Sequence, residues 1–114
     1  MDREAKKALR VQYDQRKPEM GVVCWRSGDQ MWIAVSEDAK ADYNGTLFQL
    51  KLGSWPNREM QKAYSQDPVS FQWSLLKRLD YKEREEDHRD DLELLFLMCM
   101  EEYPQAQRIR PGKR

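Results

Sequence analysis

Two short runs of β-branched and aromatic residues, with a glycine-containing turn between them, constrain the fold of this chain more than any other feature. The runs GVVCW (21–25) and MWIAV (31–35) have the composition of buried, pleated surface. Residues 27–30 separate them, and Gly28 supplies the positive φ that a tight turn needs. The segment from residue 20 to residue 35 is therefore predicted to form a β-hairpin.

Strict alternation farther along the chain indicates a third strand. Val69, Phe71, Trp73 and Leu75 alternate with polar residues, and the pattern ends at Leu76. This is the period of a strand with one buried and one polar face. Such strands are typical of antiparallel sheets that are covered on one side. We therefore expect a small three-stranded antiparallel sheet.

Two helices are predicted on either side of the hairpin. Apolar residues spaced four apart within a charged segment predict a helix over 2–17, which Pro18 ends. Ser36 or Asp38 is expected to cap a second helix, which runs to Leu52 before a glycine.

Two more helices complete the expected fold. Asn57 is placed to cap a helix over 58–65, and the last helix is expected to run from Asp90 or Asp91 to Tyr103, where a proline follows. The order is then α-β-β-α-α-β-α. We expect an α/β (α+β) fold in which helices flank the sheet.

Length and charge balance limit the domain organisation and the function. The 114 residues suffice for one domain, predicted over 1–104, and residues 105–114 form a basic segment expected to be a disordered tail. Twenty basic and twenty acidic residues give a net charge of zero. That balance argues against a protein that coats nucleic acid by bulk charge, and leaves a local basic patch open.

Cysteine usage and hydropathy predict a cytoplasmic protein without membrane contact. Cys24 and Cys99 are too few for a disulfide framework and are expected to be small buried hydrophobes. No apolar run approaches the roughly 18 residues that a transmembrane helix needs. The first ten residues are charged and lack the apolar core of a signal peptide.

The sequence lacks the motifs of several common kinds of functional site. His88 is the one histidine of the chain and has no spaced Cys or His partners, so a zinc site is not expected. The sequence contains neither glycine-rich phosphate-binding motif. The adjacent acids at 85–87, 90–91 and 101–102 are expected to face solvent.

The last predicted helix is unusual because its centre, LELLFLMCM, is apolar on nearly every side. A helix of this kind is either deeply buried or uses a second face at an interface. A small domain does not easily bury a whole helix. Self-association through the helix over 92–103 is therefore a hypothesis.

Several segments of the chain carry a resemblance to a known family through their order and spacing. They are Arg16–Pro18, Met20–Val23, Trp32–Ser36, Leu47–Ser54, Asn57–Lys62, Ser70–Leu76 and Leu79–Lys82. Taken together, these segments resemble the GIY-YIG nuclease family, in particular short stand-alone members of its homing-endonuclease-like branch. The resemblance extends from about residue 5 to residue 104.

The resemblance implies a site for phosphodiester hydrolysis with one divalent metal, Mg²⁺ or Mn²⁺. In the family, two tyrosines position or activate the water, an arginine stabilises the phosphate, and a glutamate holds the metal. Such a division of roles suits phosphoryl chemistry, in which positioning and charge neutralisation do most of the work.

Most of these site residues do not match when they are carried over position by position. The first signature tyrosine falls on Val23 and the second on Trp32. The arginine position falls on Asp42, and a frequent histidine falls on Thr46. Glu93 retains the metal-binding glutamate. The expected catalytic groups are therefore largely missing.

Two of these residues have competing interpretations. Glu93 is either a metal ligand, joined by Asp42 if the two converge, or an acid on an apolar helix that pairs with a nearby Lys or Arg. Trp32 is either a core residue or a platform for stacking bases.

Three functions follow from these observations. The first is a degenerate nuclease-like domain, without endonuclease activity, that binds nucleic acid or a protein partner. The second is an interaction module that dimerises through the last helix, and the third is an active metal-dependent DNA endonuclease with a rebuilt site. Weak, salt-sensitive nucleic-acid binding is expected to use Lys40, Lys51, Arg58 and Lys62.

Overall fold

The expected hairpin is the centre of the fold in a computed structural model, which describes residues 18–83 and 86–110. Strands β1 (Gly21–Ser27) and β2 (Gln30–Ser36) pair antiparallel along their whole length. Gly28 has φ 59° in the turn between them. The hairpin is confirmed, whereas the helix predicted over 2–17 lies outside the described residues.

Strand β3 (Gln72–Arg78) pairs antiparallel with β1. It begins and ends later in the chain than the strand predicted over 69–76. Val69 belongs instead to a short 3₁₀ turn, η1 (Pro68–Ser70), and is 91% exposed. The reason is local: the Ser70 hydroxyl and the Phe71 amide bond back to the carbonyls of Asp67 and Pro68, which prevents strand pairing there.

Helices α2 (Ala39–Leu52) and α3 (Arg58–Gln66) follow the predicted caps closely. The Asp38 carboxylate accepts the Ala41 amide at 3.1 Å, and the Asn57 side chain accepts the Met60 amide at 3.0 Å. Gly53 ends α2 in the left-handed conformation. Local chemistry therefore fixes both helices.

The structure corrects the expected three-stranded antiparallel sheet to four strands in the order β3-β1-β2-β4. The added strand, β4 (Gln107–Arg108), pairs parallel with β2. It comes from the segment expected to be a disordered tail. Ala106 and Ile109, on either side of β4, are buried, so apolar packing holds this segment on the domain at least as far as Ile109.

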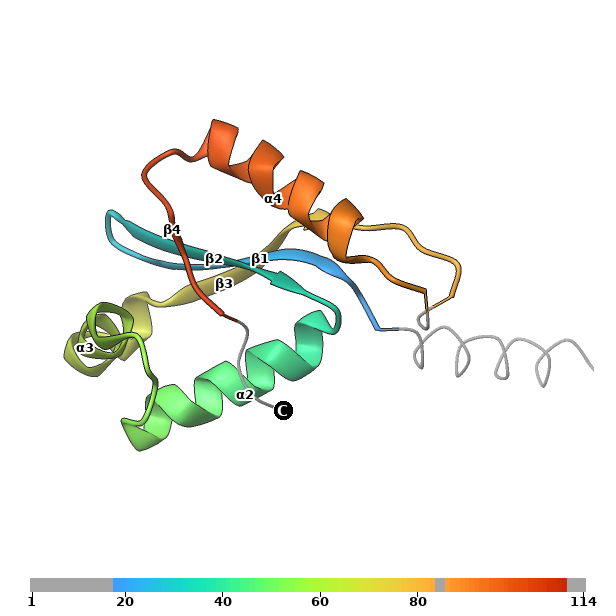
Figure 1. Cartoon of the computed structure of the whole chain (residues 1–114). Coiled ribbons are helices and arrows are strands. Elements are labelled where there is room, and N and C mark those ends of the chain that lie inside the picture. The colour runs from blue at the N-terminus through green and yellow to red at the C-terminus, as the bar shows by residue number, and fades with distance from the viewer. Residues whose placement is uncertain (1–17, 84–85, 111–114) are drawn as a thin grey trace, which may run out of the picture.

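Helices cover both faces of the sheet (Figure 1). α2 and α3 lie on one face, and α4 (Arg89–Glu102) lies on the other. Side chains alternate along β1 and β2, so each face has its own core. The first core, on the α2 and α3 side, contains Val23, Trp25, Trp32, Ala34, Ala39, Leu50, Trp55, Met60 and Ile109. The second core, on the α4 side, contains Val22, Cys24, Met31, Ile33, Phe96, Cys99 and Ala106.

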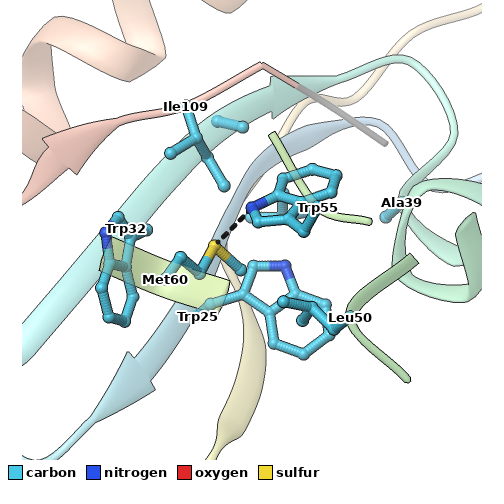
Figure 2. Packing of buried hydrophobic residues seen from close by; sticks show 9 residues of the cluster. Trp25, Trp32, Ala39, Leu50, Trp55, Met60 and Ile109 are labelled. Carbon is cyan, nitrogen blue, oxygen red and sulfur yellow. Dashed lines mark hydrogen bonds between the residues drawn. The ribbon is translucent and has the colours of Figure 1, made fainter. Parts of the chain in front are cut away.

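The first core is rich in tryptophan (Figure 2). Trp25, Trp32 and Trp55 surround Met60, and the Trp55 ring nitrogen donates to the Met60 sulfur at 3.1 Å. Large aromatic surfaces of this kind dominate the energetics of a small core.

None of the helices in the described part of the chain has the length and the hydropathy of a membrane span.

Candidate functional site

The two residues on which the sequence resemblance places the signature tyrosines lie in the core. Val23 on β1 is almost completely buried, and Trp32 on β2 is fully buried. Both belong to the first core, and the Trp32 ring stacks on Phe71 with centroids 5.8 Å apart. Neither side chain presents a hydroxyl or reaches solvent. Trp32 is therefore a core residue in this structure, and its buried ring is not accessible for stacking on a nucleic-acid base.

The two residues on which the resemblance places the family's arginine and histidine are also buried. Asp42 and Thr46 lie one turn apart on α2, and both are at most 3% exposed. The Ser36 hydroxyl donates a hydrogen bond to the Asp42 carboxylate, and the Asp38 amide donates to the Ser36 oxygen at 3.2 Å. The acid at this position thus helps join the end of β2 to the start of α2.

Glu93 lies on α4 and is captured by an arginine. Arg108 on β4 donates from Nη1 to Oε1 at 2.7 Å and from Nη2 to Oε2 at 2.8 Å. The same guanidinium lies over the Phe96 ring, 4.1 Å from its centroid. These hydrogen bonds lower the pKa of Glu93 and raise the pKa of Arg108. Of the two interpretations of Glu93, the structure contains the one in which the acid pairs with a basic side chain, here Arg108.

The residues carried over from the family do not fit a divalent metal at Glu93. Both carboxylate oxygens accept hydrogen bonds from Arg108. Asp42 is carried by α2, on the opposite face of the sheet from α4. Within residues 18–83 and 86–110, no group of three His, Cys, Asp or Glu side chains could hold a metal ion.

The candidate nucleic-acid-binding residues are accessible. Lys40 and Lys51 lie on α2, and Arg58 and Lys62 lie on α3. All four are exposed. The two helices that carry them, α2 and α3, cover the same face of the sheet (Figure 1).

His88 and the two cysteines have structural environments. His88 is buried beside Tyr81, with ring centroids 5.1 Å apart and its Nε2 atom 2.8 Å from the Glu83 carbonyl oxygen. Cys24 and Cys99 are free thiols in the second core, and burial raises the pKa of both. High thiol pKa values suppress the reactive thiolate, so the expectation of small buried hydrophobes is confirmed.

Arg108 is the residue that the sequence did not reveal. It follows Pro104 in a basic segment, where charge alone indicates a solvated terminus. The apolar residues at 106 and 109 were the available signal, since a disordered tail has no need of them. Arg108 and Asn57 also line a pocket of about 410 Å³ between β4 and the α2–α3 loop.

Comparison by structure finds similar folds, whereas comparison by sequence finds none. No protein-family model matches the chain, and no curated protein matches it significantly. The catalytic domain of the homing endonuclease I-TevI superposes with a TM-score of 0.62 at 13% identity, covering 79% of this chain and 97% of that domain. An alanine variant of the catalytic domain of intron endonuclease I-TevI gives a TM-score of 0.63 at 12% identity, covering 83% and 97%. The chain therefore has the fold of the I-TevI catalytic domain, a GIY-YIG-type fold, as the resemblance of its sequence implies.

Proposed function

We propose that this chain is a GIY-YIG-type domain without endonuclease activity, which binds nucleic acid through the side formed by α2 and α3. The observation that carries the loss of activity is the capture of Glu93 by Arg108, because it occupies both oxygens of the metal ligand that the resemblance implies. The buried Val23 and Trp32 support the same conclusion, since neither can hold a water for attack.

Nucleic-acid binding is supported by the exposed cations on α2 and α3. Contacts to phosphate by Lys and Arg release counterions, so the affinity falls as salt rises. If Lys40, Lys51, Arg58 and Lys62 all contact phosphate, the logarithm of the affinity for duplex DNA falls with the logarithm of salt at a slope of about −3 to −4. Binding should therefore be measurable at low salt and weak at physiological salt.

A paired gel-shift and plasmid-nicking experiment tests this proposal. The wild-type chain should retard DNA at low salt and leave the plasmid intact with Mg²⁺ or Mn²⁺. Arg58→Gln with Lys62→Gln should weaken binding, whereas the charge-matched control Arg78→Gln with Lys82→Gln, outside α2 and α3, should not.

A wild-type chain that fails to retard DNA at low salt would contradict the proposal, and so would two results obtained with the variants. Equal loss of binding in both double variants would leave only a nonspecific effect of net charge. Metal-dependent nicking by the wild type that disappears in Glu93→Ala would establish an active site on α4. Nicking of equal strength by both proteins would identify a contaminant and would leave the absence of intrinsic cleavage in place.

A second candidate function is dimerisation, which the outer face of α4 favours. Leu94, Leu97 and Met98 are 60%, 55% and 44% exposed and lie at helical spacing on one side of the helix. Burying such a stripe against its copy in a second chain would remove it from water. In light-scattering chromatography, Leu94→Lys with Leu97→Lys should convert a dimer to a monomer. Phe48→Lys with Leu52→Lys, on the similarly exposed apolar pair of α2, is the matched control.

A further inference from the structure

The segment from Ala106 to Arg110 forms a strap that crosses the edge of the sheet (Figure 1). At its beginning, Ala106 packs into the second core, beneath α4. At its end, Ile109 packs into the first core, on the side of α2 and α3. The strap therefore joins the two layers of helices that the sheet separates.

Backbone pairing fixes the strap against β2. Gln107 is paired with Trp32, and Arg108 with Ile33. The Ile109 amide donates to the Ile33 carbonyl at 2.8 Å. These contacts set the register of the strap, and the register determines which side chain faces α4.

The side chain delivered to α4 is Arg108. Its planar guanidinium matches the two oxygens of Glu93, and its face lies over Phe96, one turn farther along the helix. A lysine could form neither the paired hydrogen bonds nor the stacked contact in the same way. The position therefore selects an arginine.

We infer that the strap is a built-in cation for Glu93: the Arg108 guanidinium occupies the place where the family resemblance implies a divalent metal, and it latches α4 to β2. This inference rests on the proposed function, because it assumes that Glu93 serves no metal-dependent cleavage. The paired hydrogen bonds take one lone pair of each Glu93 oxygen, and the positive charge of the guanidinium repels a metal cation that approaches the same carboxylate. The latch excludes the metal and stabilises the fold with the same pair of side chains.

A double-mutant cycle on the protein alone tests the latch. Glu93→Gln and Arg108→Gln should each lower the melting temperature by about 2–6 °C, and the double variant should melt no lower than the worse single variant. Arg108→Lys should lose most of the same stability. Arg110→Gln, an exposed arginine of the same strap, is the control and should melt like the wild type.

The metal half of the inference has its own measurement. Millimolar Mn²⁺ should leave the melting temperature of the wild type unchanged and should not selectively broaden NMR signals of α4 around Glu93. Additive losses in the cycle would overturn the latch. Mn²⁺ stabilisation of the wild type that is absent in Glu93→Gln would overturn the exclusion of metal. Neither measurement contains nucleic acid, so a chain that fails to bind DNA would contradict only the proposed function.

Discussion

The Ser36 hydroxyl, at the end of β2, donates a hydrogen bond to the buried carboxylate of Asp42, in the first turn of α2. The same hydroxyl accepts the amide of Asp38, the N-cap of this helix. Asp42, on which the sequence resemblance places the family's arginine, is therefore part of the junction between strand and helix. A substitution of Asp42 is therefore expected to change the free energy of unfolding before it changes any activity.

Asp42→Arg should destabilise the domain severely, by about 3 kcal/mol or more, because it puts a long cation into a buried position and breaks the bond from Ser36. Asn44→Arg changes an exposed residue of the same helix and should stay within about 0.5 kcal/mol of the wild type. Urea denaturation measures both. A stable Asp42→Arg protein would show that the position tolerates the family's arginine.

Gly21→Ala should destabilise the domain by about 3 kcal/mol or more, at the upper end of overpacking costs, because the clash is with backbone. A Cβ at Gly21 would come within 2.0 Å of the Lys77 carbonyl oxygen on β3, where the β1–β3 register shifts. Gly28 has open space around it, so Gly28→Ala should cost only the smaller penalty of its positive φ, about 1–2 kcal/mol. Thermal unfolding should rank Gly21→Ala below Gly28→Ala, and the reverse order would contradict the close approach.

Asp87 should make the stability depend on acid pH. Hydrogen bonds from the Arg89 side chain and amide lower the pKa of Asp87 from 3.8 to about 2. Folding therefore favours the ionised form of Asp87. The stability that this carboxylate contributes is fully present above pH 3.8 and is lost as the pH falls toward 2. Asp87→Asn should flatten the fall in stability over that interval.

The carboxyl NMR titration of Asp87 supplies the direct check. Arg89→Gln removes the side-chain donors and should move the midpoint of Asp87 back toward 3.8. A wild-type midpoint already at that ordinary value would contradict the contact with Arg89.

Ile109→Ala should cost about 2–4 kcal/mol, because Ile109 is buried in the first core although it lies beyond the domain boundary predicted from the sequence. Arg110→Ala, at the next position and exposed, should change the free energy of unfolding by less than about 0.5 kcal/mol. Denaturant midpoints of the two variants measure this. Equal effects would mean that the strap contributes no packing energy.

The elements that could be predicted from the sequence are those fixed by neighbouring residues. The hairpin follows from two apolar runs and a glycine turn, and the caps Asp38, Gly53 and Asn57 act within one helical turn of their own position. The predicted start of the third strand, Val69, is three residues too early. Alternation alone does not reveal that the 3₁₀ turn η1 holds Val69 outside the sheet.

The candidate site depended on contacts between distant segments. The residue types at Val23, Trp32 and Asp42 can be read directly from the chain, so the mismatch with the groups that the resemblance implies is visible before folding. The pairing of Glu93 with Arg108, fifteen residues away, depends on how the chain folds back on itself and becomes visible in three dimensions. A two-residue strand has almost no local signal of its own; it forms because β2 offers an open edge, and because the two cores accept Ala106 on one side and Ile109 on the other.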